Sequence, residues 1–122
     1  MARILVCDDD DAFSGVVAAY LEKAGHTVSR CVDVMQLATV LGHEHADLLI
    51  VDMQMPGGGG PAAARLLSAG QKTMPVIVCS GMPPEQQKAW FAGTLRARFL
   101  QKPVKLEDLR KHIDEILASP AA

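Results

Sequence analysis

Short apolar runs alternate along the chain with segments of helical periodicity. Three runs, at residues 3–7, 47–51 and 75–79, are apolar almost throughout and rich in β-branched residues. Such runs are typical of strands that are covered on both faces, as in parallel sheets. The segment 27–32 alternates more strongly and fits an edge or near-edge strand, and residues 97–100 predict a fifth, short strand.

The segments between these strands predict helices. Apolar residues recur at helical spacing over 13–24, where Gly25 marks the end, and over 34–41, where Asp33 is a suitable N-cap. The clearest stripe covers residues 106–117.

Two further helices, with weaker patterns, are expected at 61–69 and 84–92. Strands and helices that alternate in this way predict the α/β class, as a doubly wound five-stranded parallel sheet with helices on both faces. We expect one domain over residues 1–118 and a frayed C-terminal tail at 119–122.

Composition narrows the classes of function. The chain has 122 residues and a formal net charge of −2, which gives no field to attract nucleic acid or an anionic membrane. No apolar stretch approaches the roughly 20 residues of a membrane span, and no signal peptide opens the chain. We therefore expect a cytoplasmic protein that binds neither nucleic acid nor membrane.

The chain has three cysteines, Cys7, Cys31 and Cys79, each in or beside an apolar run. Their odd number and wide spacing favour neither a disulfide framework nor a metal site. We expect three buried, reduced thiols.

Polar residues gather where the predicted strands end. Four aspartates, residues 8–11, follow the first strand, Asp52 follows the third, Ser80 the fourth, and Lys102 the fifth. In an open parallel sheet ligands bind beyond these ends. Converging carboxylates require a cation, and Mg²⁺ accepts one or two of them together with phosphate oxygens. An ammonium from Lys102 and a hydroxyl from Ser80 would complete a pocket for a phosphoryl group near Asp52.

Four segments, RILVCDD, DLLIVDMQMPGGGG, PVIVCSG and RFLQKPV, occur in the order and at the strand ends found in the response-regulator receiver family. The sequence resembles that family over essentially its whole length. The resemblance implies a flavodoxin-like sheet with strand order 2-1-3-4-5 and Mg²⁺ as the cofactor.

The resemblance also implies roles for the acidic residues. Asp52 looks like the phosphoacceptor. Asp8 and Asp9 look like the acidic pair of the metal site, with Asp9 the direct Mg²⁺ ligand and Asp8 acting through water. Gln54 would offer its backbone carbonyl to the metal.

The remaining positions of the family pattern concern the switch. Ser80 would be the hydroxyl that moves toward the phosphoryl group, and Lys102 would bind that group. The Lys102–Pro103 bond is expected to be cis. Phe99 stands where the family has its rotating aromatic. Phosphorylation would then reshape the face formed by the fourth helix, fifth strand and fifth helix.

This interpretation describes a phosphoacceptor with Mg²⁺-dependent self-phosphorylation and autodephosphorylation, rather than an enzyme that turns over a substrate. The implied partners are a histidine kinase or histidine phosphotransfer protein and an unknown downstream protein, with the receiver monomeric or weakly dimeric on phosphorylation. Met1 opens directly into the first strand, which favours a natural start. A receiver fragment of a hybrid histidine kinase, or a degenerate receiver that acts as a docking module, remains an alternative.

Two other functions fit the residues less well. An aspartate-nucleophile phosphohydrolase would need a cap domain and a second acid near Asp52, where Gln54 stands instead. A flavodoxin-like flavin carrier would need a phosphate-cradling loop where the four aspartates lie.

Overall fold

A computed structural model gives the fold of the chain. The predicted helix 61–69 and the end of 84–92 lie partly outside the residues that the structure describes, and the tail 119–122 lies wholly outside them. The described residues are 2–52, 54, 57, 62–66, 74–90 and 96–118.

Five parallel strands form a single sheet, in the order β2-β1-β3-β4-β5. This confirms the predicted fold class and strand order. β4 extends one residue further than expected, so that Ser80 is its last residue. The strands are β1 (Arg3–Cys7), β2 (Thr27–Cys31), β3 (Leu48–Val51), β4 (Val76–Ser80) and β5 (Ala97–Gln101).

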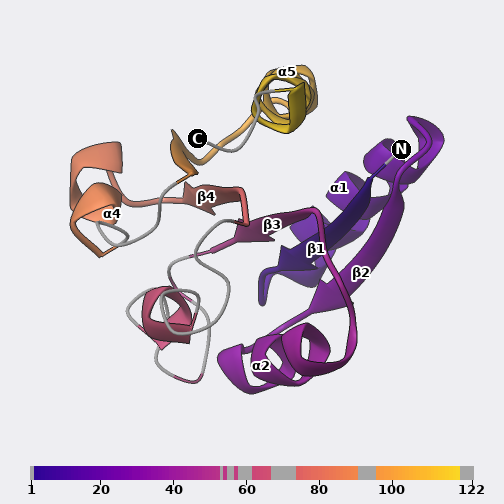
Figure 1. The fold of residues 1–122 in the computed structure, drawn as a ribbon. Coiled ribbons are helices and arrows are strands. Elements are labelled where there is room, and N and C mark those ends of the chain that lie inside the picture. Colours follow the sequence, from indigo (N-terminus) through magenta and orange to yellow (C-terminus); the bar gives the residue numbers. More distant parts are fainter. Residues whose placement is uncertain are drawn as a thin grey trace.

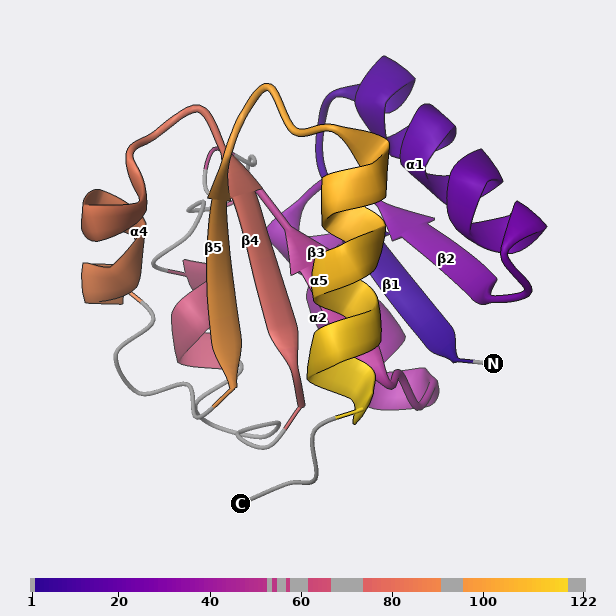
Figure 2. The same cartoon turned by 90° about the horizontal axis from the view of Figure 1, so that it is seen from above.

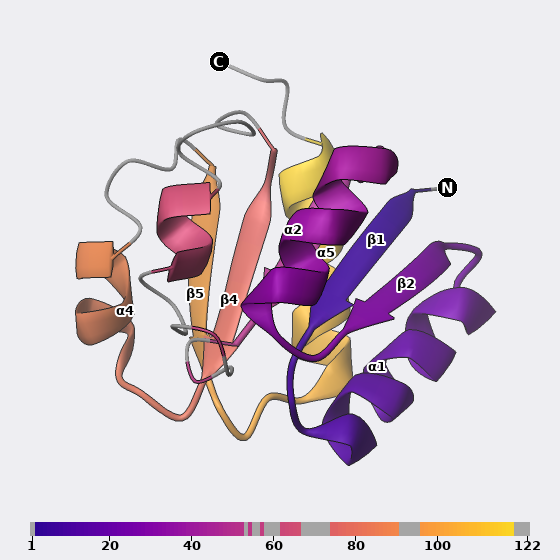
Figure 3. The same ribbon diagram turned by 90° about the horizontal axis from the view of Figure 1, so that it is seen from below.

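Helices cover both faces of the sheet. α1 and α5 lie together on one face, whereas α2 and the helical residues 62–66 lie on the other (Figures 1, 2 and 3). α4 lies beside β5 at one edge of the sheet (Figure 2). The bounds of the helices are α1 (Asp11–Lys23), α2 (Val34–His43), α4 (Pro84–Trp90) and α5 (Leu106–Ala118).

The two-sided cover explains why the inner strands are apolar at every position. Successive side chains of a strand point to opposite faces. In β1, Ile4 and Val6 join the cluster under α1 and α5, whereas Leu5 and Cys7 join the cluster that includes Leu37 of α2. Both faces of the sheet are therefore buried, and only the strand ends remain available for polar chemistry.

Local signals position the helices as the sequence predicted. Asp10 is the N-cap of α1 and accepts a hydrogen bond from the Phe13 N–H, and Asp33 caps α2 in the same way. Gly25, just beyond α1, has φ +99°, a left-handed conformation that favours glycine at this place. With Asp10 as its N-cap, α1 begins at Asp11, the last of the four aspartates that follow β1.

The expectation of three reduced thiols is wrong for two of the cysteines. Cys7 and Cys31 are opposite one another in the β1–β2 register and form a disulfide. The spacing of 24 residues could not reveal this, because the register that brings the two Cα atoms to 4.6 Å is set by strand pairing. Cys79 is free and buried, and burial raises the pKa of its thiol to about 12.

None of the helices in the described part of the chain combines the length and apolarity needed to cross a membrane.

Candidate functional site

The sheet brings two aspartates to its carboxyl edge. Asp8 directly follows β1, and its N–H donates to the Cys31 carbonyl at 3.0 Å; Asp52 directly follows β3, and its N–H donates to the Cys7 carbonyl at 3.0 Å. These bonds continue the strand ladders by one residue. The backbone of each aspartate is therefore held by the sheet itself.

Three carboxylates converge at this edge. Asp8, Asp9 and Asp52 each offer one oxygen, and these oxygens all lie within 4.8 Å of one another. Asp8 is 2% exposed and Asp52 is 6% exposed, whereas Asp9 is open to solvent. Asp8 also accepts a hydrogen bond from the Asp10 N–H at 2.9 Å, which holds the turn between β1 and α1.

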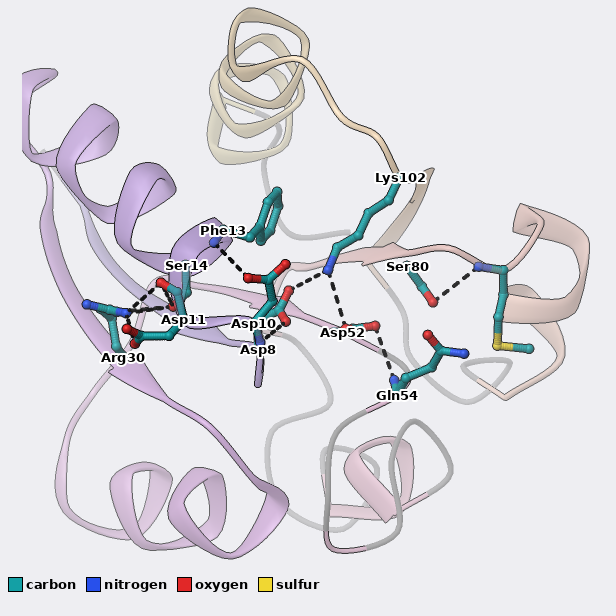
Figure 4. Close-up of polar contacts among 11 residues, drawn as sticks. Asp8, Asp10, Asp11, Phe13, Ser14, Arg30, Asp52, Gln54, Ser80 and Lys102 are labelled. Atoms are coloured by element: carbon teal, nitrogen blue, oxygen red, sulfur yellow. Dashed lines mark hydrogen bonds and ion pairs between the residues drawn. The ribbon is translucent and has the colours of Figure 1, made fainter.

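Lys102 brings the positive charge to this group. Its backbone N–H donates to the Ser80 carbonyl at 2.7 Å, which holds the end of β5 beside the end of β4. Its Nζ lies 2.8 Å from Oδ2 of Asp8 and 3.4 Å from Oδ2 of Asp52, and Figure 4 shows the amine reaching between the two. We call Asp8, Asp9, Asp52 and Lys102 the acid–lysine cluster.

The ring of Phe13 gives Lys102 a further partner. Nζ lies 4.4 Å from the ring centroid, within the range of a cation–π interaction. Phe13 belongs to the first turns of α1, so the Asp10 cap that starts this helix also positions the ring. The sequence marked Phe13 only as a member of the apolar helix stripe, and nothing in that pattern indicated contact with the lysine.

The electrostatics of the acid–lysine cluster follow from burial. Burial raises the pKa of Asp8, and the hydrogen bond from Lys102 only partly offsets it. Burial also disfavours the charged form of Lys102, but the hydrogen bond to Asp8 and the charges of Asp52 and Asp8 outweigh it, so the pKa of Lys102 is raised. The Lys102 amine therefore stays cationic, whereas the charged form of the Asp8 carboxyl is disfavoured by its burial.

The donor set fits a divalent cation. Among the described residues, three carboxylates and one ammonium meet here, which leaves an excess of negative charge at a partly buried place. Carboxylate oxygens are the hard ligands that Mg²⁺ prefers, and the exposed side of Asp9 leaves room for the waters that Mg²⁺ retains.

The structure also describes the contacts of the other residues singled out in the sequence. Gln54 donates its N–H to Oδ1 of Asp52 at 3.1 Å. Ser80 is fully buried, and its Oγ accepts a hydrogen bond from the Met82 N–H at 3.3 Å (Figure 4). We call residues 80–83 the Ser80 loop. Phe99, in the middle of β5, is half-buried against the same apolar cluster as Met82. The Lys102–Pro103 bond is cis, as expected.

The sequence itself matches a known family. The model of the response regulator receiver domain matches residues 4–114. The chain belongs to the response regulator receiver domain family. As a receiver domain it is a phosphoacceptor switch of two-component signalling. Members of this family interact with histidine kinases or phosphotransfer proteins.

Relatives of this receiver include proteins of very different length. It is 34% identical over 120 residues to the protein PilH of Pseudomonas aeruginosa, and the match covers 97% of this chain and 99% of PilH. It is also 34% identical over 122 residues to the sensory/regulatory protein RpfC of Xanthomonas campestris pv. campestris. That match covers 96% of this chain but 17% of RpfC.

Solved receiver structures have the same fold. The non-phosphorylated HemR receiver domain of Leptospira biflexa superposes with a TM-score of 0.90 at 19% identity, over 100% of this chain and 98% of that one. The receiver domain of the sensor histidine kinase PA1611 of Pseudomonas aeruginosa has a TM-score of 0.85 at 21% identity, over 97% and 98% of the two chains. In that structure a magnesium ion is coordinated in the active site cleft.

Proposed function

We propose that this receiver accepts a phosphoryl group on Asp52 in a reaction that requires Mg²⁺. The observation that carries the proposal is the meeting of Asp8, Asp9 and Asp52 within 4.8 Å of one another, with the Lys102 amine 3.4 Å from Asp52. An anionic nucleophile can accept an anionic group only where positive charge is already present. The magnesium-containing PA1611 receiver supports this cofactor by likeness of fold.

The chemistry assigns a part to each residue. An oxygen of Asp52 attacks phosphorus, the bond from phosphorus to the donor breaks, and the donor leaves with its electron pair. Asp9 and Asp52 would ligate Mg²⁺ directly, with Asp8 acting through water and Gln54 through its backbone carbonyl. The ion would supply charge neutralisation between the nucleophile and the phosphoryl oxygens. Lys102 would turn from the carboxylates to a phosphoryl oxygen.

The phosphoryl donors we propose are a histidine kinase, a histidine phosphotransfer protein or a small acyl phosphate. Water would reverse the modification by attacking the same phosphorus. Once Asp52 is modified, Ser80 would donate its hydroxyl to a phosphoryl oxygen and Phe99 would turn, which changes the face made by α4, β5 and α5 for a downstream protein. We place this function in residues 1–118 and expect a monomer or a weak, phosphorylation-dependent dimer.

Incubation with acetyl phosphate tests the proposal. We expect the intact mass to rise by one phosphoryl group when Mg²⁺ is present and to stay unchanged when the ion is chelated. The adduct should be released by hydroxylamine, as an acyl phosphate is. Asp52→Asn should abolish it, because an amide is a poor nucleophile.

Asp10→Asn is the matched control. Asparagine caps a helix as well as aspartate does, so this change removes one carboxylate near the acid–lysine cluster and leaves α1 intact. It should become phosphorylated like the original protein. An undiminished adduct on Asp52→Asn would place the acceptor elsewhere, and no adduct on the original protein would favour a docking module.

A further inference from the structure

Gln87 of α4 is a buried polar side chain with a specific set of partners. It is 0% exposed, and its Nε2 donates to the Met82 carbonyl at 2.6 Å and to the Leu100 carbonyl at 3.2 Å. Both partners are acceptors, so the amide nitrogen must face them and the amide oxygen must face away. One side chain thus joins the Ser80 loop to β5.

The side-chain oxygen of Gln87 differs from the nitrogen in its surroundings. Oε1 of Gln87 is buried, and no donor among the described residues reaches it. The donors of Nε2 are therefore the part of the amide whose partners the structure describes, and they link two backbone carbonyls of different segments.

Gln87 is connected to the phosphorylation site through Met82. The N–H of Met82 donates to Oγ of Ser80, while its carbonyl accepts from Gln87. The two polar groups of this one residue therefore tie Ser80 on one side and Gln87 on the other. A movement of Ser80 toward Asp52 would pull on the Met82 N–H, and a displaced Met82 carbonyl would weaken its bond with Gln87 and alter the bond from Gln87 to the Leu100 carbonyl.

We propose that Gln87 is a positioning residue that holds the Ser80 loop against β5 in the unphosphorylated receiver and transmits the movement of Ser80 to β5. This inference rests on the proposed function of Asp52. It adds a residue, Gln87, that couples the position of Ser80 to β5. In the arrangement described, Ser80 Oγ is bonded to the Met82 N–H and Lys102 contacts Asp52 directly, so a phosphoryl group that draws Ser80 inward works against the clamp. Loss of the clamp should therefore make the phosphorylated arrangement easier to reach.

A second link joins the same two segments at the surface. The side chain of Gln101, at the end of β5, donates to the Gly81 carbonyl at 3.2 Å. Gln101 is exposed, so water can replace its bond at little cost, whereas water does not reach Gln87. The buried link is expected to dominate, and the exposed one provides a comparison within the same protein.

Binding of beryllofluoride, a mimic of the phosphoryl group, measures the effect. With Mg²⁺ present, the apparent Kd of Gln87→Met should fall by about 2- to 10-fold relative to the original protein, the range expected for removing one or two hydrogen bonds from the unbound state. Amide NMR shifts give the second readout. Beryllofluoride should shift Ser80 and Leu100 together in the original protein, whereas in Gln87→Met the shift at Leu100 should shrink.

Further variants complete the experiment. Gln86→Met changes the same residue type one position earlier, at an exposed place, and Gln101→Met removes the surface link; both should keep the original Kd within twofold. If Gln87→Met does not fold, Gln87→Asn serves instead, since it is one methylene too short to reach both carbonyls. In a Ser80→Ala background, the effect of Gln87→Met on the Kd should disappear.

The outcomes separate this inference from the proposed function. If the original protein does not bind beryllofluoride, both fail. If it binds, but Gln87→Met has an unchanged or weaker affinity and an undiminished shift at Leu100, the assignment of Gln87 is wrong while the function of Asp52 stands.

Discussion

The acid–lysine cluster and the Ser80 loop lie at the same edge of the sheet but are built differently. The backbone of Asp8 and Asp52 is fixed by hydrogen bonds that continue the strand ladders, so these groups lie where the register puts them. The two ends of the Ser80 loop are also held by backbone bonds, at the Ser80 and Pro83 carbonyls. Between them, the Met82 carbonyl is held by the side chain of Gln87, which also bonds to Leu100 of β5.

This difference in construction matches two different roles: the acid–lysine cluster carries out phosphoryl transfer, and the Ser80 loop responds to it. A group that transfers phosphate must be in place beforehand, because small displacements of a nucleophile are costly. A group that reports the transfer must be able to move, and a few side-chain hydrogen bonds are easier to exchange than a strand ladder. Changes in the acid–lysine cluster should therefore abolish or slow the reaction, whereas changes in the Ser80 loop should shift an equilibrium by a smaller factor.

Lys102→Met should give the largest effect of the changes considered below. It keeps a long apolar stem but removes the only ammonium among the described residues that contacts both Asp8 and Asp52. We expect the rate of phosphorylation by acetyl phosphate to fall by about 100-fold or more, as when a preorganised charge is lost from a transition state. The rate is followed by intact mass at saturating Mg²⁺.

Lys105→Met is the control for that change. Lys105 is exposed three residues further along the chain, so its loss alters the net charge equally without touching the acid–lysine cluster. Its rate should match that of the original protein. A decrease of the same size in both variants would mean that overall charge, rather than the geometry of Lys102, governs the reaction.

The acid–lysine cluster could be predicted from the sequence, whereas the contacts that hold the Ser80 loop could not. Strand ends are visible as apolar runs followed by polar residues, and parallel pairing brings such ends together, so Asp8, Asp52 and Lys102 could be grouped in advance. Gln87 could not, because its helix has a mixed pattern and its bonds join carbonyls that depend on tertiary packing. The disulfide between Cys7 and Cys31 was missed for a related reason, because the spacing of two residues along the chain does not determine the register in which their strands pair.

Removing one buried carboxylate should stabilise the metal-free fold. The folded-state pKa of Asp8 lies above its ordinary value of 3.8, so the folded chain holds this proton more tightly than the unfolded chain does. The resulting stability is complete below pH 3.8 and is lost as the pH rises through the folded pKa. At pH 7, Asp8→Asn should therefore raise the melting temperature by roughly 2 to 5 °C, with Lys102 still paired to Asp52.

Two further measurements sharpen the result for Asp8→Asn. The advantage of the variant should shrink as the pH is lowered toward 4, because the original protein then takes up its proton. Added Mg²⁺ should raise the melting temperature of the original protein more than that of the variant, since ligand binding stabilises the fold that provides the carboxylates. A variant that melts lower than the original at pH 7 without Mg²⁺ would show that the Lys102–Asp8 bond outweighs the burial of the carboxyl.

The smallest expected effect belongs to Phe13, the aromatic partner of Lys102. Phe13→Leu keeps an apolar side chain on α1 but removes the ring face that lies 4.4 Å from Nζ. A cation–π contact at a partly exposed site contributes modestly, so the phosphorylation rate should fall by about 2- to 5-fold. Phe13→Tyr retains the ring and should restore the original rate. Because the ring acts on the lysine, Phe13→Leu should lose its effect when combined with Lys102→Met; an equal loss in both backgrounds would mean that Phe13 supports the site through packing alone.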